Sequence, residues 1–491
     1  MNARDSATPP RLHPERLHGP PPSVQRPSYV RDRLARGIVH LGIGAFARAH
    51  LAAATEQAIE DSGDLRWGMV GVSLRHADTR DALAPQQGLY TLAECDADAR
   101  GCPRQRLRVI GCLVDLLVGP ENPGAVVQAI AHADTRIVSL TITEKGYVDS
   151  TPGNAVQVIV DGLAARRAAG RAGVTLLSLD NLPSNGAQLA RRVREMAAHD
   201  GELVQWIDAH CTFPNSMVDR IVPRTTPADA AAVSAALGLH DAGPVLAEPF
   251  FDWAVEDRFA AGRPPWSDRL VRAVDDAAPW EQMKLRLVNG AHSQIAYLGA
   301  MAGWPTVDAA VAKPELAAHA MALLRDEMEP TLPPQVPADR DAYRAALLQR
   351  WRNPALAHRC QQIAMDGSQK IPQRWVRPLA ERLANRQPID RLALGVAAWC
   401  HYLRGVDEAG AAYPIDDPLA DTLRALQQRA LAAGDVRAEA CEWLSLHAVF
   451  GPLTGNETLA GALGMWLWSL RVRGVAATLR SLAEPAQRPR G

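Results

Sequence analysis

Apolar and polar positions alternate in blocks along the first 280 or so residues. Short runs rich in β-branched residues are separated by alanine-rich stretches with helical spacing. Such runs, apolar on both faces and separated by helices, are typical of a parallel sheet covered by helices. The predicted strands are 38–42, 67–74, 137–143 and 174–179, and the clearest predicted helices are 47–60 and 186–198.

The pattern changes near residue 280, because strand signals disappear and long helical stretches follow. These stretches are interrupted by proline and glycine and cover 283–302, 314–329, 389–404 and 418–433. We therefore predict an α/β domain over residues 31–280 and a mostly helical domain over 281–491, with no internal repeat. Residues 1–30, rich in proline and arginine, are expected to form a loose N-terminal arm.

Composition narrows the class of protein. The chain has 491 residues and 53 Lys and Arg against 54 Asp and Glu, which disfavours a nucleic-acid-binding protein with a basic surface. No run of 18 or more apolar residues predicts a membrane span. Seven scattered cysteines without a C-x-x-C pair, and a first segment without an apolar core, favour a cytoplasmic protein. A monomer or small homo-oligomer is expected.

The first predicted strand leads into a glycine-rich turn. The motif is G-x-G-x-x-A, formed by Gly42, Gly44 and Ala47, with Ala45 and Phe46 opening the next helix. Gly42 suits a tight turn, Gly44 lets a pyrophosphate approach the backbone, and the helix amides point at the phosphates. In this setting of strand, turn and helix the motif predicts a Rossmann-like dinucleotide-binding domain, although any tight strand–helix turn has a similar sequence.

The choice between NAD and NADP depends on the end of the second predicted strand. A carboxylate expected there would bind the ribose hydroxyls of NAD, and the nearest acid is Asp78. Arg75, closer to the strand end, suits the 2′-phosphate of NADP. We expect NAD, with NADP left open.

A dehydrogenase also needs a group that exchanges a proton with its substrate. No tyrosine is followed four residues later by lysine, and the cysteine spacing does not indicate a zinc site. A lysine or a histidine remains. Lysine is scarce here, because only Lys145, Lys284, Lys313 and Lys370 stand beside 49 arginines.

One of these lysines lies in the middle of an apolar helical stripe. With Lys284 at zero and about 100° per residue, Leu287, Val288, Ala291 and Ile295 surround it. On the flank of the same side, and at the same spacing of about 100° per residue, Asn289 lies near 140° and His292 near 80°. Burial disfavours an ammonium, so a lysine here is suited to act as a base, which arginine is not. A lysine that extends to solvent or pairs with an acid is the plainer alternative.

Two further segments offer polar groups. Asn181 follows a buried strand and is expected at the carboxyl edge of the sheet. Asp219 and Arg220 form a charged pair inside an apolar run, for which a structural ion pair is the alternative. Sites in proteins of this kind tend to lie at the open end of the sheet between the domains.

Several ordered segments resemble the polyol-specific long-chain dehydrogenases of the mannitol dehydrogenase family. The resemblance extends from about residue 38 to residue 482 of the chain. The matching segments are IVHLGIGAFARAH, SLTITEKGY, SLDNLPSNG, FPNSMVDRIVP, EPFFDWAVED, MKLRLVNGAHS, NPALAHRCQQIAMDGSQKIPQRW and LALGVAAWCHYLRGVDE.

The resemblance implies a metal-independent oxidoreductase with a lysine acid/base. In the family pattern, Lys284 exchanges the proton, Asn181 and Asn289 hold the reacting oxygen, and His292 contacts the substrate. Glu281 is implied to pass the proton to solvent and Asp219 to support the site. Glu281 and Asp219 are therefore expected to be supporting residues of the site, in contrast to the four catalytic ones.

The details of the match favour a sugar acid over a polyol. Two segments, SLTITEKGY and AMDGSQKIPQRW, resemble the family's fructuronate reductases more than its mannitol 2-dehydrogenases. A substrate-binding arginine of the latter is replaced by Gln362. A sugar acid needs a cation for its carboxylate, and Lys145, Lys370 or Arg374 is expected to supply it. The expected reaction interconverts D-mannonate and D-fructuronate, with D-mannitol and D-fructose as the alternative. A cofactor-binding sensor without catalysis is disfavoured by the intact lysine segment.

Overall fold

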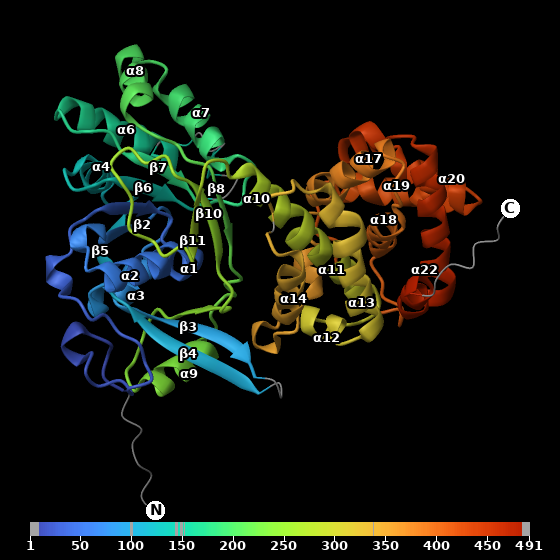
Figure 1. The fold of residues 1–491 in the computed structure, drawn as a ribbon, viewed down its shortest axis with the longest axis horizontal. Helices are drawn as coiled ribbons and strands as arrows, with labels where there is room; N and C mark the ends of the chain where they lie inside the picture. Colours follow the sequence, from blue (N-terminus) through green and yellow to red (C-terminus); the bar gives the residue numbers. More distant parts are fainter. Residues whose placement is uncertain are drawn as a thin grey trace, which may run out of the picture. The chain divides into compact units, whose positions relative to one another are not determined.

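The computed structural model describes residues 9–98, 102–142, 146–147, 151, 153–336 and 338–483. The chain divides into two compact units, Met1–Ala278 and Pro279–Gly491. The first contains the sheets and the second is helical, so the predicted fold class, an α/β dinucleotide-binding domain followed by a mostly helical one, is confirmed (Figure 1).

A five-stranded parallel sheet is the centre of the first unit. Its order is β5-β2-β1-β6-β7, with the first strand of the chain in the middle, which is the order of a dinucleotide-binding sheet. The strands are β1 (Ile38–Leu41), β2 (Met69–Ser73), β5 (Leu113–Val118), β6 (Ile137–Leu140) and β7 (Thr175–Ser178).

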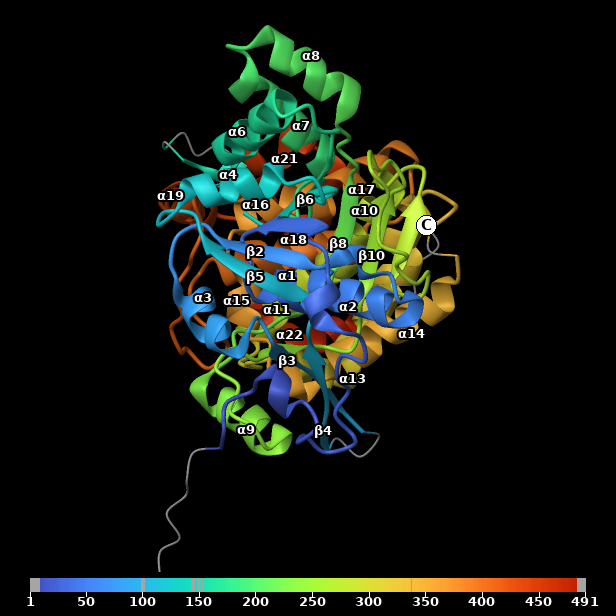
Figure 2. The same ribbon diagram turned by 90° about the vertical axis from the view of Figure 1, so that its left-hand side faces the viewer.

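Alternate residues of these strands enter two different cores. Ile38 of β1 faces the core that includes α1 (Ala45–Ala49) and α2 (Leu51–Ser62). Val39 faces the core on the opposite side of the sheet, where α4 and α6 cover it (Figure 2). Both faces are buried, which explains why the strands read as continuous apolar runs. The remaining helices are α3 (Asp78–Leu83), α4 (Pro123–Ala131), α6 (Ala155–Ala168), α7 (Asn185–Ala197), α8 (Gly201–His210) and α9 (Pro227–Leu237).

Two smaller mixed sheets, which the sequence pattern did not predict, complete the first unit. One has the order β4-β3-β9 and the other β11-β10-β8. In the first, β3 pairs antiparallel with β4 and parallel with β9. The strands are β3 (Tyr90–Ala97), β4 (Pro103–Ile110), β9 (Val245–Ala247), β8 (Ser216–Asp219), β10 (Asp252–Glu256) and β11 (Val271–Val274).

The expectation of a loose N-terminal arm does not hold for residues 9–30. Leu12 and Val24 are buried, and the backbone of Gln25 pairs with Leu107 and Val109 of β4. A few apolar anchors and main-chain hydrogen bonds are sufficient to attach this proline-rich segment to the first unit.

The second unit is built from helices around one apolar core. Its most buried helices are α11 (Ala291–Met301) and α18 (Asp390–Tyr402), which pack against each other. Helix α18 also packs against α22 (Glu457–Ala483). No strand follows β11 in the described chain. The other helices are α10 (Ala278–Met283), α12 (Val307–Val311), α13 (Pro314–Ala322), α14 (Arg340–Trp351), α15 (Cys360–Ala364), α16 (Gly367–Ile371), α17 (Arg377–Ala384), α19 (Ala420–Ala432), α20 (Val436–Leu444) and α21 (His447–Phe450).

Three segments of this unit are π-helical. They are η5 (Lys284–Gly290), η6 (Leu323–Met328) and η9 (Pro372–Val376). The straight helix expected over 283–302 is therefore wrong in detail, because η5 leads into α11. Among the described residues, no helix is both long and apolar enough to cross a membrane.

Candidate active site

The carboxyl edge of the five-stranded sheet encloses a cavity of about 760 Å³. The loops that line it follow β1, β2, β5 and β6, so the cavity lies where the strand order reverses, at the usual ligand site of such sheets. Gly42, Gly44 and Asp78 are among the lining residues, as predicted for a cofactor site. Ala45, Phe46 and Ala47 form the beginning of α1, and Ala47 is buried in the core.

The two glycines have different reasons to lack a side chain. Gly42 has a φ of +93°, and a Cβ there would lie 2.2 Å from the carbonyl oxygen of Thr141. A Cβ on Gly44 would meet only the Gly42 oxygen, at 3.9 Å, so this position is open toward the cavity. The first glycine is thus needed by the turn, and the second leaves room for a ligand at the backbone. The cradle therefore fits a dinucleotide.

A buried histidine in β1, His40, is connected to this turn by hydrogen bonds. The ring nitrogens of His40 lie 2.9 Å from Ser139 Oγ and 3.1 Å from Thr141 Oγ1. Thr141 Oγ1 in turn donates a hydrogen bond to the Gly42 carbonyl oxygen. Burial lowers the pKa of His40 to about 4, so the ring is neutral at pH 7. The sequence interpretation missed this histidine, although a polar residue in an apolar strand was a visible signal.

The loop after β7 carries Asn181 and a buried carboxylate beside it. Asn181 is exposed and lies three residues past the strand end, at the predicted edge of the sheet. Asp180 accepts hydrogen bonds from the Ile142 amide at 2.9 Å and from the Tyr147 hydroxyl at 3.0 Å. Ile142 lines the cofactor cavity. Asp180, which was not predicted, therefore ties the segment that carries Asn181 to the cavity wall.

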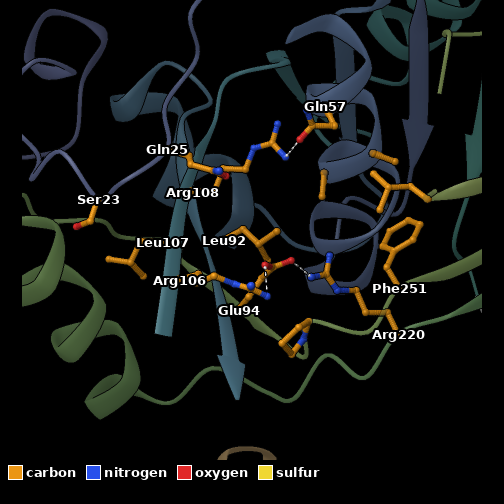
Figure 3. A pocket seen from close by; sticks show the side chains of 14 residues that line it. Ser23, Gln25, Gln57, Leu92, Glu94, Arg106, Leu107, Arg108, Arg220 and Phe251 are labelled. Atoms are coloured by element: carbon orange, nitrogen blue, oxygen red, sulfur yellow. Dashed lines mark hydrogen bonds and ion pairs between the residues drawn. The ribbon is translucent and has the colours of Figure 1, made fainter. Parts of the chain in front are cut away.

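Asp219 and Arg220, the charged residues at the end of β8, have different structural environments. Asp219 is the last residue of the strand and is buried. Arg220 forms a structural ion pair, but its partner is Glu94 of β3, at 2.5 Å (Figure 3), and not the neighbouring Asp219 of the predicted pair. Lys145 lies outside the described residues.

In the second unit, the predicted lysine segment is η5. Lys284 is 8% exposed, among buried Leu287 and Val288, so its predicted place on the apolar side is confirmed. Asn289 and His292 are half-buried, as is Glu281, three residues before the lysine in α10. A single turn of π-helix inside an α-helix is rare and is frequent at functional sites.

The segment η9 packs against η5 and holds two of its carbonyl groups. Arg374 donates to the Asn289 oxygen at 3.3 Å and to Ser293 Oγ at 2.6 Å. Trp375 Nε1 donates to the Gly290 oxygen at 3.1 Å. Burial lowers the pKa of Arg374 to about 10, which leaves it charged at neutral pH. A guanidinium thus lies beside Asn289.

Two other predicted residues have different surroundings. Lys370 Nζ donates to the carbonyl oxygens of Met365 at 2.5 Å and Ile363 at 3.3 Å, and Asp366 lies 3.9 Å away. Burial and the charge of Arg374 lower the pKa of Lys370 to about 8. Gln362 is exposed.

A second histidine, missed in the sequence, lies against His292. The rings of His292 and His358 meet edge to face at 5.1 Å. Burial lowers the pKa of His358, and the charges of Arg350 and Lys370 act in the same direction. His358 lies in one of the family-matching segments but had no partner visible in sequence. Among the described residues, no group of three or more His, Cys, Asp or Glu could hold a metal ion.

Comparison with known proteins places these features in one family. Residues 36–268 match the model of the mannitol dehydrogenase Rossmann domain, and 276–467 match that of the mannitol dehydrogenase C-terminal domain. A D-mannonate oxidoreductase of Escherichia coli is 38% identical over 94% of this chain and 98% of its own. A mannitol 2-dehydrogenase of Pyrenophora tritici-repentis is also 38% identical, over 82% of this chain and 75% of its own.

A solved structure shows the same fold. Mannitol 2-dehydrogenase of Pseudomonas fluorescens, in a ternary complex with NAD and D-mannitol, is 35% identical. It superposes with a TM-score of 0.82, covering 97% of this chain and 100% of that one.

Proposed function

The chain belongs to the mannitol dehydrogenase family of oxidoreductases, which act on CH–OH groups, and we propose that its own reaction interconverts D-mannonate and D-fructuronate. The enzyme uses NAD. The observation that carries the choice of a sugar acid is the guanidinium of Arg374 beside Asn289 and Ser293, with the Lys370 ammonium one helical turn earlier in the chain. Cations of this kind are suited to a carboxylate.

We assign the proton transfer to Lys284. NAD held in the cradle around Gly42 and Gly44 would supply the hydride acceptor in oxidation and, in its reduced form, the hydride donor in reduction. In oxidation, neutral Lys284 takes the hydroxyl proton, and in reduction its ammonium returns that proton. Asn181 and Asn289 donate hydrogen bonds to the reacting oxygen, which stabilises charge on it in the transition state. His292 contacts the substrate, Glu281 relays the proton to solvent, and Asp219 supports the site.

The substrate assignment is tested by steady-state rates. Reduction of NAD+, followed by absorbance at about 340 nm, is expected to have a higher kcat/KM with D-mannonate than with D-mannitol. The alternative, a mannitol 2-dehydrogenase, draws support from the fungal relative, which is also 38% identical. Faster oxidation of D-mannitol would favour that alternative. The same assay with NADP+ measures the cofactor preference.

The preference for a sugar acid over a polyol is expected to depend on pH through Lys370. Only the ammonium attracts a carboxylate, and with a pKa of about 8 it is present below that pH and lost above it. We expect the ratio of kcat/KM for D-mannonate to that for D-mannitol to fall about tenfold between about pH 7 and about pH 9. The ratio removes the pH dependence of proton abstraction, which both substrates share. In Lys370→Met the ratio should be low and independent of pH; a slope as steep as that of the wild type would exclude Lys370.

A further inference from the structure

The π-helical form of η5 has a bearing on two residues to which a catalytic role is assigned. Lys284 and Asn289 are five residues apart, and a regular α-helix would place them about 140° from each other. A π-helix instead pairs each residue with the fifth one along the chain, so residues at this spacing lie one turn apart on the same side. The π form therefore brings the lysine and the side-chain amide onto one side of the helix, as two groups that act on one oxygen require.

The end of η5 is held by hydrogen bonds from side chains of another segment, η9. Asn289 and Gly290 are the last two residues of η5. Trp375 Nε1 donates to the Gly290 oxygen at 3.1 Å, and Arg374 donates to the Asn289 oxygen at 3.3 Å. Side chains that insert into the hydrogen-bond ladder of a helix are an established cause of irregular helix geometry. Both donors therefore act where η5 meets α11.

Of these two donors, Trp375 is the one with a single task in the site. Arg374 also donates to Ser293 and carries a charge proposed for the substrate carboxylate. Trp375 is fully buried, and so is its hydrogen bond to Gly290. The ring of Tyr297, from α11, meets the indole edge to face with the centroids 5.9 Å apart. The indole is thus packed against α11 and joined to the end of η5.

The backbones of η5 and η9 lie close together at this point. A Cβ on Gly290 would lie 2.9 Å from Met328 Cε and 3.6 Å from the carbonyl oxygen of Arg374. The form of η9 has a local cause, because Pro372 at its first position has no N–H to donate to a carbonyl group four residues earlier. This segment is therefore irregular by its own sequence and can impose its geometry on η5.

We propose that Trp375 is a positioning residue of the dehydrogenase, whose hydrogen bond to Gly290 holds η5 in the π form that presents Lys284 and Asn289 to the same oxygen. The inference rests on the roles proposed for these two residues. Trp375, being fully buried, acts through the backbone of η5 and does not touch the substrate. Without its hydrogen bond, η5 relaxes toward a regular helix, which turns Lys284 away from Asn289 and slows proton transfer.

Two substitutions of Trp375 separate its hydrogen bond from its bulk. Trp375→Phe keeps more apolar volume but has no donor. Trp375→His is smaller and keeps a ring N–H two bonds from Cγ, where the indole has its own. With the better of D-mannonate and D-mannitol as substrate, we expect kcat to fall about tenfold or more in Trp375→Phe and to fall less in Trp375→His. The dissociation constant of NADH should stay within about twofold in both.

Trp443→Phe is the matched control for the loss of bulk. Trp443 is 2% exposed and belongs to α20 of the same unit, which packs against α19 and α22. Urea denaturation should show comparable losses of stability in the two Phe variants, whereas kcat should fall only in Trp375→Phe. The solvent deuterium isotope effect on kcat should be larger in Trp375→Phe than in the wild type, because proton transfer is the step that is slowed.

The outcomes separate this inference from the proposed reaction. It is overturned, even if Lys284→Ala is inactive, by a kcat of Trp375→Phe within about threefold of that of Trp443→Phe. A Trp375→His variant less active than Trp375→Phe, or an isotope effect no larger than that of the wild type, overturns it as well. If Trp375→Phe does not fold, a kcat of Trp375→His above about one-tenth of the wild-type value supports the inference, and a lower one overturns it. An active Lys284→Ala variant overturns the proposed function and this inference together.

Discussion

Replacing Lys284 with alanine is expected to lower kcat by at least about a hundredfold while leaving the dissociation constant of NADH within about twofold. The loss follows from the removal of the group that takes the hydroxyl proton. The buried neighbours Leu287 and Val288 offer no substitute for it. Steady-state rates at saturating substrate and fluorescence titration with NADH measure the two quantities separately.

Two further variants make this test specific. Lys284→Arg keeps a positive charge but cannot release a proton near neutral pH, so it should be almost as inactive as the alanine variant. Lys313→Ala makes the same chemical change at an exposed lysine, near the ring of Trp304, and should leave kcat unchanged. An active Lys284→Arg variant would show that the charge matters and proton transfer does not, which would contradict the proposed role.

Replacing Gly42 with alanine is expected to damage both folding and cofactor binding. The new Cβ would lie 2.2 Å from the Thr141 oxygen, on a backbone whose φ of +93° alanine rarely adopts. The turn must therefore move, and we expect a loss of unfolding free energy of about 1–3 kcal/mol and a dissociation constant for NADH raised more than tenfold. Urea denaturation and NADH fluorescence measure these effects.

Gly44→Ala is the matched variant for this prediction. Its φ of −79° suits alanine, and its Cβ would meet only the Gly42 oxygen, at 3.9 Å. The new methyl group would instead occupy space in the cavity that the cofactor is expected to fill. We expect nearly normal stability with weakened NADH binding. Equal destabilisation by both substitutions would contradict the different roles assigned to the two glycines.

Elements with a strong local pattern were predictable from the sequence. The run from Ile38 to Leu41, followed by Gly42 and Gly44, identified the first strand and its turn, because burial on both faces and the glycine spacing each leave a mark in one segment. The lysine segment was equally visible, since Lys284 interrupts an apolar stripe. In both cases, neighbours in sequence carry the information.

Features that depend on distant partners were not predictable. The arginine-rich β4 resembles a loop in sequence, and it is a strand because β3 and Gln25 pair with its backbone. His358 acquires its surroundings from His292, which lies far away in the chain. The spacing of apolar residues also cannot reveal the π-helical form of η5, because the apolar positions of this short segment fit an α-helix as well as a π-helix.

The π-helical form of η5 has a consequence for any transfer of this lysine site to another scaffold. In a π-helix each backbone hydrogen bond spans one residue more than in an α-helix. The side chain of Lys284 therefore points in a different direction relative to the side chains of α11 than it would in a regular α-helix. A regular helix advances about 100° for each residue, so straightening η5 would rotate Lys284 by about that angle relative to His292. The sequence motif alone, copied onto an ideal helix, would therefore carry the right residues in the wrong directions.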